Sequence, residues 1–278
     1  MDLSRFGMDT VTLAGPLEAK LAAARGAGFS QIMLWAGDLA GHPGGPQAAL
    51  DRVRASGLRV TGLQVLRDYE GLEGALHIYK RGIAAELLAL CAAAGAPLLM
   101  VCSSTSAHAD GDLARIAHDL GELAELAAPH GVRIAYEALS WGRHVNRYTQ
   151  SWDAVRRAGH ENLGIVLDSY HILASGPGLD ALDAIPVERI ALVQLADFLW
   201  PQLEGMEQRT ETARHLRVFP GEGVHGVQLT ELAGRLERAG YRGDYSFEVM
   251  NDDYLLLPPA VVAARARSAA EWTIRQLS

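Results

Sequence analysis

Lysine is nearly absent from this chain of 278 residues. Lys20 and Lys80 are the only two lysines, and neither directly follows an apolar run of the kind that forms a buried strand. A lysine that forms an imine with its substrate needs such a desolvated position, so covalent lysine chemistry is a poor hypothesis. Arginine supplies almost all of the positive charge, and its planar fork suits two-point binding of carboxylate or phosphate groups.

Cysteine is equally scarce. Cys91 lies in a helical pattern and Cys102 at the end of an apolar run, and both have apolar neighbours. Two such thiols predict neither a disulfide framework nor a Cys-x-x-Cys metal site. The simplest interpretation is two buried free thiols.

The chain also lacks a long apolar run and an excess of basic charge. No stretch approaches the ~18 apolar residues of a membrane span, and the N-terminus shows no signal-peptide pattern, so we expect a cytoplasmic protein that does not bind a membrane. The formal net charge of −8 argues against binding the backbone of a nucleic acid. The first strand–helix turn has no G-x-G-x-x-G loop, and no G-x-x-x-x-G-K-[ST] loop occurs anywhere.

What the chain does contain is a regular alternation of short apolar runs and helical patterns. Runs typical of strands lie at residues 6–13, 31–35, 58–65, 97–102, 132–136, 163–167, 189–195 and 245–249. Helical patterns lie between or after them, at 16–27, 47–55, 75–94, 112–128, 147–158, 227–239 and 261–276. Glycines at 28, 57, 95 and 240 stand where C-terminal helix caps are expected.

Strands that alternate with helices predict a parallel sheet. Eight such units in a chain of this length favour an α/β fold of the (β/α)8 TIM-barrel type, formed by residues 1–278 as a single domain. A polar insertion at 198–220 follows the seventh strand and is expected near the mouth of the site. A doubly wound open sheet is the alternative.

Oxygen-bearing side chains follow the last four predicted strands. Glu137, Asp168, Gln194 and Glu248 stand at the ends of strands five to eight, where a barrel places its active site. Carboxylates gathered in this way raise one another's pKa unless a cation lies among them. Oxygen ligands favour a hard divalent ion such as Mg²⁺ or Mn²⁺. The ambiguous member is Gln194, because a buried amide at a strand end is often only a structural hydrogen-bonding group.

The same rule places other polar residues at the rim. Strand three is followed by Arg67, and strand four by Ser103. His171 lies three residues after Asp168, and Arg143 and His144 follow Glu137 within a short loop.

Several strings in the chain resemble those of the xylose isomerase-like TIM-barrel superfamily, which includes sugar phosphate isomerases and epimerases. The likeness is greatest to bacterial 3-dehydroshikimate dehydratases. The strings that carry it are LQVLRDYEG (63–71), LMVCSS (99–104), YEALSWGRHVN (136–146), LDSYH (167–171), VQLAD (193–197), RHLRVFPGEG (214–223) and SFEVMNDDY (246–254).

The resemblance implies a single divalent metal ion, Mn²⁺ or Mg²⁺ with Co²⁺ or Zn²⁺ as alternatives. Its ligands would be Glu137, Asp168, Gln194 and Glu248. His171 would be the general acid/base, with His144 as a second catalytic candidate that also contacts the substrate. Arg67, Ser103, Arg143 and Arg217 would bind the substrate. Such barrels often self-associate, so a homo-oligomer is compatible with the resemblance.

One segment departs from the dehydratases. Met33 and Ala36 stand in the second strand region where those enzymes carry acidic residues, and only Asp38 remains of their acidic string. The resemblance therefore indicates the chemistry more firmly than the substrate.

Three hypotheses follow for the function. The first is a metal-dependent lyase that removes water from 3-dehydroshikimate and gives protocatechuate. The second is a sugar or sugar-phosphate isomerase or epimerase with the same metal site. The third, from another class, is a non-catalytic ligand-binding barrel or a nucleic-acid enzyme, which the net charge of −8 disfavours.

Overall fold

The computed structural model describes residues 1–176 and 178–277. Its sheet contains parallel strands in the order of the chain, β1 to β8, and the sheet closes on itself. This topology confirms the (β/α)8 class that the alternation predicts. The strands are β1 (Phe6–Asp9), β2 (Gln31–Trp35), β3 (Arg59–Arg67), β4 (Leu98–Cys102), β5 (Arg133–Glu137), β6 (Leu163–Asp168), β7 (Ile190–Leu195) and β8 (Tyr245–Phe247).

The helices match most of the predicted segments. They are α1 (Leu17–Gly26), α2 (Ala36–Ala40), α3 (Gly45–Ser56), α4 (Gly74–Ala94), α5 (Leu113–Ala127), α6 (Tyr148–Ala158), α7 (Ser169–Ser175), α8 (Gly205–His215), α9 (Gly226–Arg238), α10 (Asp252–Leu255) and α11 (Pro259–Gln276). The sequence patterns missed α2, α7 and α10, which are short, and α8, which lies in the polar insertion. The three short helices have too few turns to show a clear apolar period, and α8 is too polar to show one.

The first strand is shorter than its apolar run suggests. It ends at Asp9, and residues Thr10–Thr12 form a 3-10 turn rather than a continued strand. The hydroxyl of Thr10 accepts a hydrogen bond from the Trp35 N–H at 2.9 Å, which ties the turn to the end of β2. Asp9 therefore lies at the end of the strand and not in its middle.

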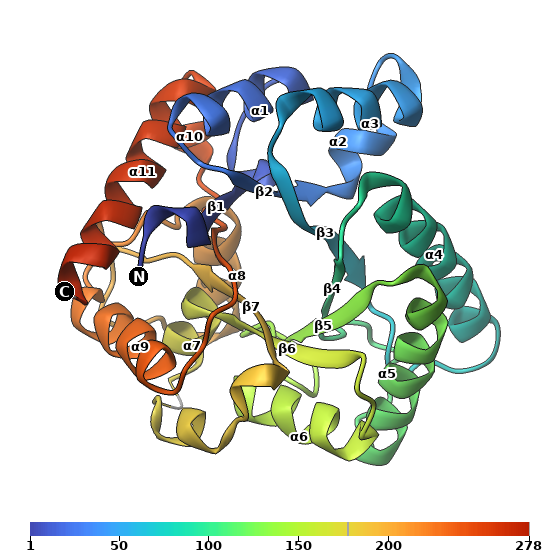
Figure 1. Ribbon diagram of the computed structural model, residues 1–278. Coiled ribbons are helices and arrows are strands. Elements are labelled where there is room, and N and C mark those ends of the chain that lie inside the picture. The colour runs from blue at the N-terminus through green and yellow to red at the C-terminus, as the bar shows by residue number, and fades with distance from the viewer. Residues whose placement is uncertain (177, 278) are drawn as a thin grey trace. The chain divides into compact units, whose positions relative to one another are not determined.

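Contacts divide the chain into two compact units. Unit 1 contains Met1–Thr61, Asp168–Tyr170 and the described residues from Val193 onward. In this unit β1 pairs with β2 and with β8, and Val193–Leu195 of β7 pairs with β8. Helix α1 packs beside α11, as Figure 1 shows. The aromatic core includes Phe6, which stacks on Tyr245 and Phe247 with ring centroids 5.4 and 5.8 Å apart.

Unit 2 contains Gly62–Leu167 and His171–Leu192. Here β3 pairs with β4, β4 with β5, and β5 with β6. All residues of β4 and β6 are buried, as expected for parallel strands that are covered on both faces. Helices α4, α5 and α6 lie in sequence along this unit, with α5 against both neighbours (Figure 1).

The glycines expected as helix caps have that role. Gly57 and Gly95 follow α3 and α4 with φ of 69° and 66°, the left-handed conformation that glycine adopts without steric cost. Within the described residues, no helix is both long enough and apolar enough to cross a membrane.

A glycine in β1 gives a test of the packing in unit 1. A Cβ on Gly7 would lie 2.8 Å from Gln31 Cγ and 3.0 Å from the Gln31 carbonyl oxygen of β2. We expect Gly7→Ala to lower the free energy of unfolding by about 1–3 kcal/mol, because backbone must move to admit the methyl group. Urea unfolding monitored by circular dichroism measures the change.

The matched control is Gly82→Ala in α4. A Cβ there meets nothing within 4 Å, so this substitution should raise the free energy of unfolding by about 0.5–1 kcal/mol through helix propensity. Equal effects of the two substitutions would contradict the packing described here.

Candidate metal centre

A buried arginine joins two of the expected ligands in unit 1. Arg217 is only 1% exposed, and its Nη1 donates to Asp168 Oδ2 at 2.8 Å and to Glu248 Oε2 at 3.1 Å. Asp168 ends β6, and Glu248 directly follows β8. The sequence predicts Arg217 as a substrate-binding residue, and in this structure its guanidinium contacts the two carboxylates.

Two further contacts hold this arginine against the insertion after β7. Arg217 Nε donates to the Ala213 carbonyl of α8 at 2.8 Å, and the guanidinium lies over the Tyr170 ring at 4.5 Å. The Tyr170 hydroxyl in turn donates to the Arg209 carbonyl, also in α8, at 2.5 Å. The backbone of α8 therefore positions both the arginine and the aromatic ring beneath it.

The amide of Gln194 is oriented by a carboxylate that the sequence reasoning overlooked. Gln194 Nε2 donates to Asp9 Oδ2 at 2.7 Å, and the Ser246 hydroxyl donates to the other oxygen of Asp9. Both Asp9 and Gln194 are fully buried. Because the nitrogen faces Asp9, the amide oxygen must point the other way, and Gln194 Oε1 accepts no hydrogen bond from the described residues. A buried acceptor without a donor is the kind of atom that a cation would satisfy.

The charges in unit 1 also favour a cation. Burial, followed by the charge of Glu248, raises the pKa of Asp9 well above its ordinary value, and Asp168 adds to the effect. Hydrogen bonds from Ser246 and Gln194 act in the opposite direction. Asp9, Asp168 and Glu248 are three buried carboxylates, and Arg217 contacts Asp168 and Glu248, so a divalent ion would relieve their mutual repulsion. The residues of this unit fit the expected metal.

The fourth expected ligand and the expected acid/base lie together in unit 2. Glu137 ends β5 and is buried, and Cys102 Sγ donates to its Oε2 at 3.0 Å. His171 is also buried, and its Nε2 lies 3.8 Å from Glu137 Oε1. The Trp141 ring contacts the imidazole edge-on, with centroids 5.1 Å apart.

The backbone determines which nitrogen of His171 carries a proton. The Ser140 N–H donates to Nδ1 at 3.1 Å. Because a backbone amide can only donate, Nδ1 must be the acceptor, and the proton of the neutral ring is on Nε2. The edge of the ring nearest Glu137 is therefore a hydrogen-bond donor.

The other predicted site residues of unit 2 have different surroundings. Ser103 is buried, and its hydroxyl accepts from the Leu139 N–H at 3.0 Å. Arg67 and Arg143 are exposed, so their side chains can reach a soluble anion. His144 Nε2 lies 2.9 Å from the Ala109 carbonyl, which makes that nitrogen a donor to the protein backbone.

A second buried acid was also missed by the sequence reasoning. Glu70 Oε1 accepts from the Ser104 N–H at 2.6 Å and from the Tyr136 hydroxyl at 2.8 Å. Burial raises the pKa of Glu70 to about 7. Glu70 lies within LQVLRDYEG, three residues after the end of β3. The rule for strand ends takes only the first polar residues after the strand, so it did not reach Glu70. Asp9 was hidden for another reason, since its strand was expected to continue to residue 13.

Comparisons with known proteins identify the family and the fold of the chain. A family model described as xylose isomerase-like TIM barrel matches residues 21–276. The 3-dehydroshikimate dehydratase of Pseudomonas aeruginosa is 38% identical over 90% of this chain, and the match covers 38% of that protein, so the chain spans about two fifths of this relative's length. The inosose isomerase of Halalkalibacterium halodurans is 30% identical over 50% of this chain and 46% of its own.

One solved structure shares the fold over nearly the whole chain. A crystal structure of the IOLI protein with a zinc atom superposes with a TM-score of 0.82 and 20% identity, covering 99% of this chain and 98% of that one.

The contact between Asp9 and Gln194 yields a prediction about metal affinity. In Asp9→Asn, the new amide can donate to Gln194, and the glutamine then turns its nitrogen toward the proposed metal position. We expect divalent-metal affinity to fall about 10–100-fold, as for other contacts that orient a ligand. Isothermal titration with Mn²⁺ measures the affinity.

A double-mutant cycle separates orientation from charge. If Asp9 acts by turning the amide, Asp9→Asn has no further effect in a Gln194→Ala background. An undiminished effect in that background would show that Asp9 acts through its charge on Glu248 and Asp168 instead.

Glu70 yields a prediction about pH. Below its ordinary pKa of 4.5 the carboxyl is protonated in both the folded and the unfolded chain. As the pH rises toward about 7, only the unfolded chain ionises, so this residue lowers stability progressively and the loss is complete above about pH 7. The free energy of unfolding of the wild type, relative to that of Glu70→Gln, should therefore fall by about 3 kcal/mol between pH 4 and pH 8. Urea unfolding across this range tests it, and a flat difference would contradict it.

Proposed function

The chain belongs to the family of xylose isomerase-like TIM barrels, and on that basis we propose that it is an enzyme that binds one divalent metal ion and acts on an α-hydroxyketone. The proposed ligands are Glu137, Asp168, Gln194 and Glu248. The observation that carries the proposal is the buried Gln194 Oε1, which has no hydrogen-bond donor among the described residues while Asp9 holds the amide nitrogen. Mn²⁺ or Mg²⁺ is favoured by the excess of oxygen ligands.

The proposed reaction is the loss of water from 3-dehydroshikimate to give protocatechuate. Its support is the Pseudomonas aeruginosa dehydratase, which is 38% identical over 90% of this chain. The relative is much longer than the aligned region, so the activity of this chain by itself is part of the proposal. The gain of an aromatic ring makes this dehydration favourable.

When bound, the divalent ion supplies Lewis-acid stabilisation of the negative charge that develops on the substrate oxygen as the adjacent C–H ionises. His171 supports the same charge in this proposal, by donating a hydrogen bond from Nε2. The base half of its predicted acid/base role would need the Nδ1 lone pair, which already accepts the Ser140 N–H. We therefore assign His171 the donor half of that role. In this proposal the Glu137 carboxylate, with Oε1 3.8 Å from His171 Nε2, takes the C–H proton and then gives it to the departing hydroxyl, which leaves as water.

The substrate carboxylate is assigned to exposed arginines. Arg67 and Arg143 can each bind a carboxylate in two-point geometry, whereas Arg217 is buried and already bound to Asp168 and Glu248. Ser103 and His144 complete the proposed substrate contacts. In this proposal Arg217 keeps the two carboxylates oriented rather than binding the substrate directly.

The altered second-strand region bears on specificity. Met33 is fully buried in unit 1, and the remaining acid, Asp38, forms a buried ion pair with Lys20 at 2.7 Å. Lys20 thus engages Asp38 Oδ1, while the buried Asp38 Oδ2 has no hydrogen-bond partner among the described residues.

Isomerisation or epimerisation of a sugar is the second candidate. The inosose isomerase of Halalkalibacterium halodurans, 30% identical over half of this chain, favours it. Both reactions begin with removal of a proton beside a ketone, and they differ in whether a hydroxyl leaves or a proton returns. A cytoplasmic location and a homo-oligomeric state stay predictions.

One experiment tests both the metal and the substrate. Purified wild-type protein with Mn²⁺ should convert 3-dehydroshikimate to protocatechuate, seen as a rise in ultraviolet absorbance. Glu248→Ala should bind less than one tenth of the wild-type amount of Mn²⁺, and His171→Gln should retain its Mn²⁺ while its kcat falls by about 10²-fold or more.

The outcomes separate the parts of the proposal. Undiminished metal in Glu248→Ala would overturn the ligand set, whatever the substrate is. Normal metal content without protocatechuate, but with epimerisation of a ketose, would favour the second candidate.

A further inference from the structure

A second group of potential metal ligands lies in unit 2, outside the site described above. His77 belongs to α4, and Asp119 and Glu122 stand three residues apart on α5. One donor atom from each of the three lies within 4.8 Å of the other two. Residues three apart share a helix face, so α5 presents two carboxylates to one histidine of its neighbour.

The spacing of the donor atoms suits a small divalent ion. His77 Nε2 and Glu122 Oε2 are 3.5 Å apart, too far for a hydrogen bond of normal length. Two ligand atoms at about 2.1 Å from a zinc ion lie about 3.4 Å apart when the coordination is tetrahedral. The 3.5 Å between His77 Nε2 and Glu122 Oε2 is therefore close to the distance between two ligand atoms of one zinc ion.

A buried hydroxyl gives an independent indication. Tyr69 is fully buried, and its hydroxyl has no hydrogen-bond partner among the described residues. The Tyr69 ring contacts His77 with centroids 5.9 Å apart, and the hydroxyl is near enough to Glu122 and Asp119 for their charges to act on it. Burial raises its pKa to about 12, so it is a neutral phenol that needs a partner at this position.

Nearby arginines leave room for a cation. Arg81 binds Glu122 Oε1 at 2.9 Å, and Arg115 binds Asp119 Oδ1 at 3.0 Å and Glu73 at 3.1 Å. The two arginines face three carboxylates, so the group keeps an excess negative charge before any metal binds. The contact of Arg81 is with Oε1, and Glu122 Oε2 is the oxygen that faces His77.

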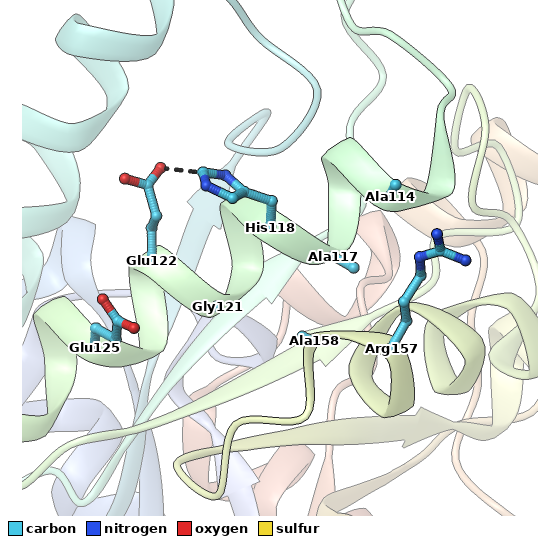
Figure 2. A pocket seen from close by; sticks show the side chains of 8 residues that line it. All are labelled: Ala114, Ala117, His118, Gly121, Glu122, Glu125, Arg157 and Ala158. Atoms are coloured by element: carbon cyan, nitrogen blue, oxygen red, sulfur yellow. Dashed lines mark ion pairs between the residues drawn. The ribbon is translucent and has the colours of Figure 1, made fainter.

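The group is also reachable from solvent. Glu122 borders a surface pocket of about 490 Å³ along α5 and the end of α6, and the side chains of Glu122 and His118 point toward one another there (Figure 2). Arg157 stands on the α6 side of the same pocket in Figure 2. An ion can thus enter beside Glu122 without passing through the core.

We propose that His77, Asp119 and Glu122 form a second divalent-metal site, specific for zinc-like ions and separate from the proposed catalytic metal. One histidine nitrogen and two carboxylate oxygens favour Zn²⁺, Co²⁺ or Ni²⁺ over Mg²⁺, because imidazole is a poor ligand for Mg²⁺. The site is structural: Asp119 Oδ2 also accepts the Gly71 N–H at 2.8 Å, so the ion would fix α4 and α5 to the loop that follows β3. That loop carries Glu70 and begins directly after Arg67.

The test counts metal ions on the full chain. Protein freed of metal by chelation is titrated with Zn²⁺ alone, for wild type, His77→Ala, Glu122→Gln and Glu248→Ala. The matched control is His130→Ala, which removes an exposed histidine and so tests for nonspecific binding of zinc to surface histidines. We expect two equivalents in wild type and His130→Ala, and one in each of the other three variants, with affinity for the lost equivalent reduced more than about 100-fold.

Co²⁺ gives a second measurement that identifies the site. The visible absorption of four-coordinate Co²⁺ should appear in Glu248→Ala and be absent from the double variant His77→Ala/Glu248→Ala. Equal stoichiometry in wild type and His77→Ala, or an equal loss in His130→Ala, would overturn the second site. If Glu248→Ala binds as much zinc as wild type while His77→Ala loses one equivalent, the proposed catalytic ligand set fails and the second site stands.

Discussion

The structure of unit 1 depends on the buried cation of Arg217. The Arg217 side chain is almost completely inaccessible, and it contacts the carboxylates of Asp168 and Glu248 through the same nitrogen. Burying a guanidinium is costly unless its charge and its donors are matched, and here two carboxylates and the Ala213 carbonyl match them. In return, the arginine holds the end of β6 and the end of β8 at a separation that two bare carboxylates would not keep. Asp9 and Gln194 are arranged around that pair.

The sequence predicted the fold well because the strand and helix patterns alternate repeatedly along the chain. Most strand residues are buried, and helices α3, α4 and α6 each end at a left-handed glycine, so an error at one boundary leaves the alternation intact. The rule that places side chains at strand ends needs only the positions of the strands. It therefore also identified the four proposed ligands, Glu137, Asp168, Gln194 and Glu248. Their roles as ligands stay predictions.

What the sequence could not supply are facts about orientation. Nothing in the string LDSYH indicates that a backbone amide would occupy His171 Nδ1. Nothing in VQLAD indicates which end of the Gln194 amide faces the protein, since this depends on Asp9, 185 residues away. The family resemblance implied that Arg217 binds substrate, whereas its burial follows from its contacts with Ala213, Asp168 and Glu248. Such properties arise from contacts between distant segments, and local patterns do not encode them.

The attachment of α8 to Arg217 and Tyr170 has a consequence for how this scaffold can change. Helix α8 lies in the insertion that is expected near the mouth of the proposed site. It accepts hydrogen bonds through its Arg209 and Ala213 carbonyls from Tyr170 and Arg217, which contact Asp168 and Glu248. Replacing this insertion by that of a relative would therefore alter the support of the carboxylates along with the shape of the entrance. A change in α8 and a change in the two carboxylates would therefore have to be made together for these contacts to be kept.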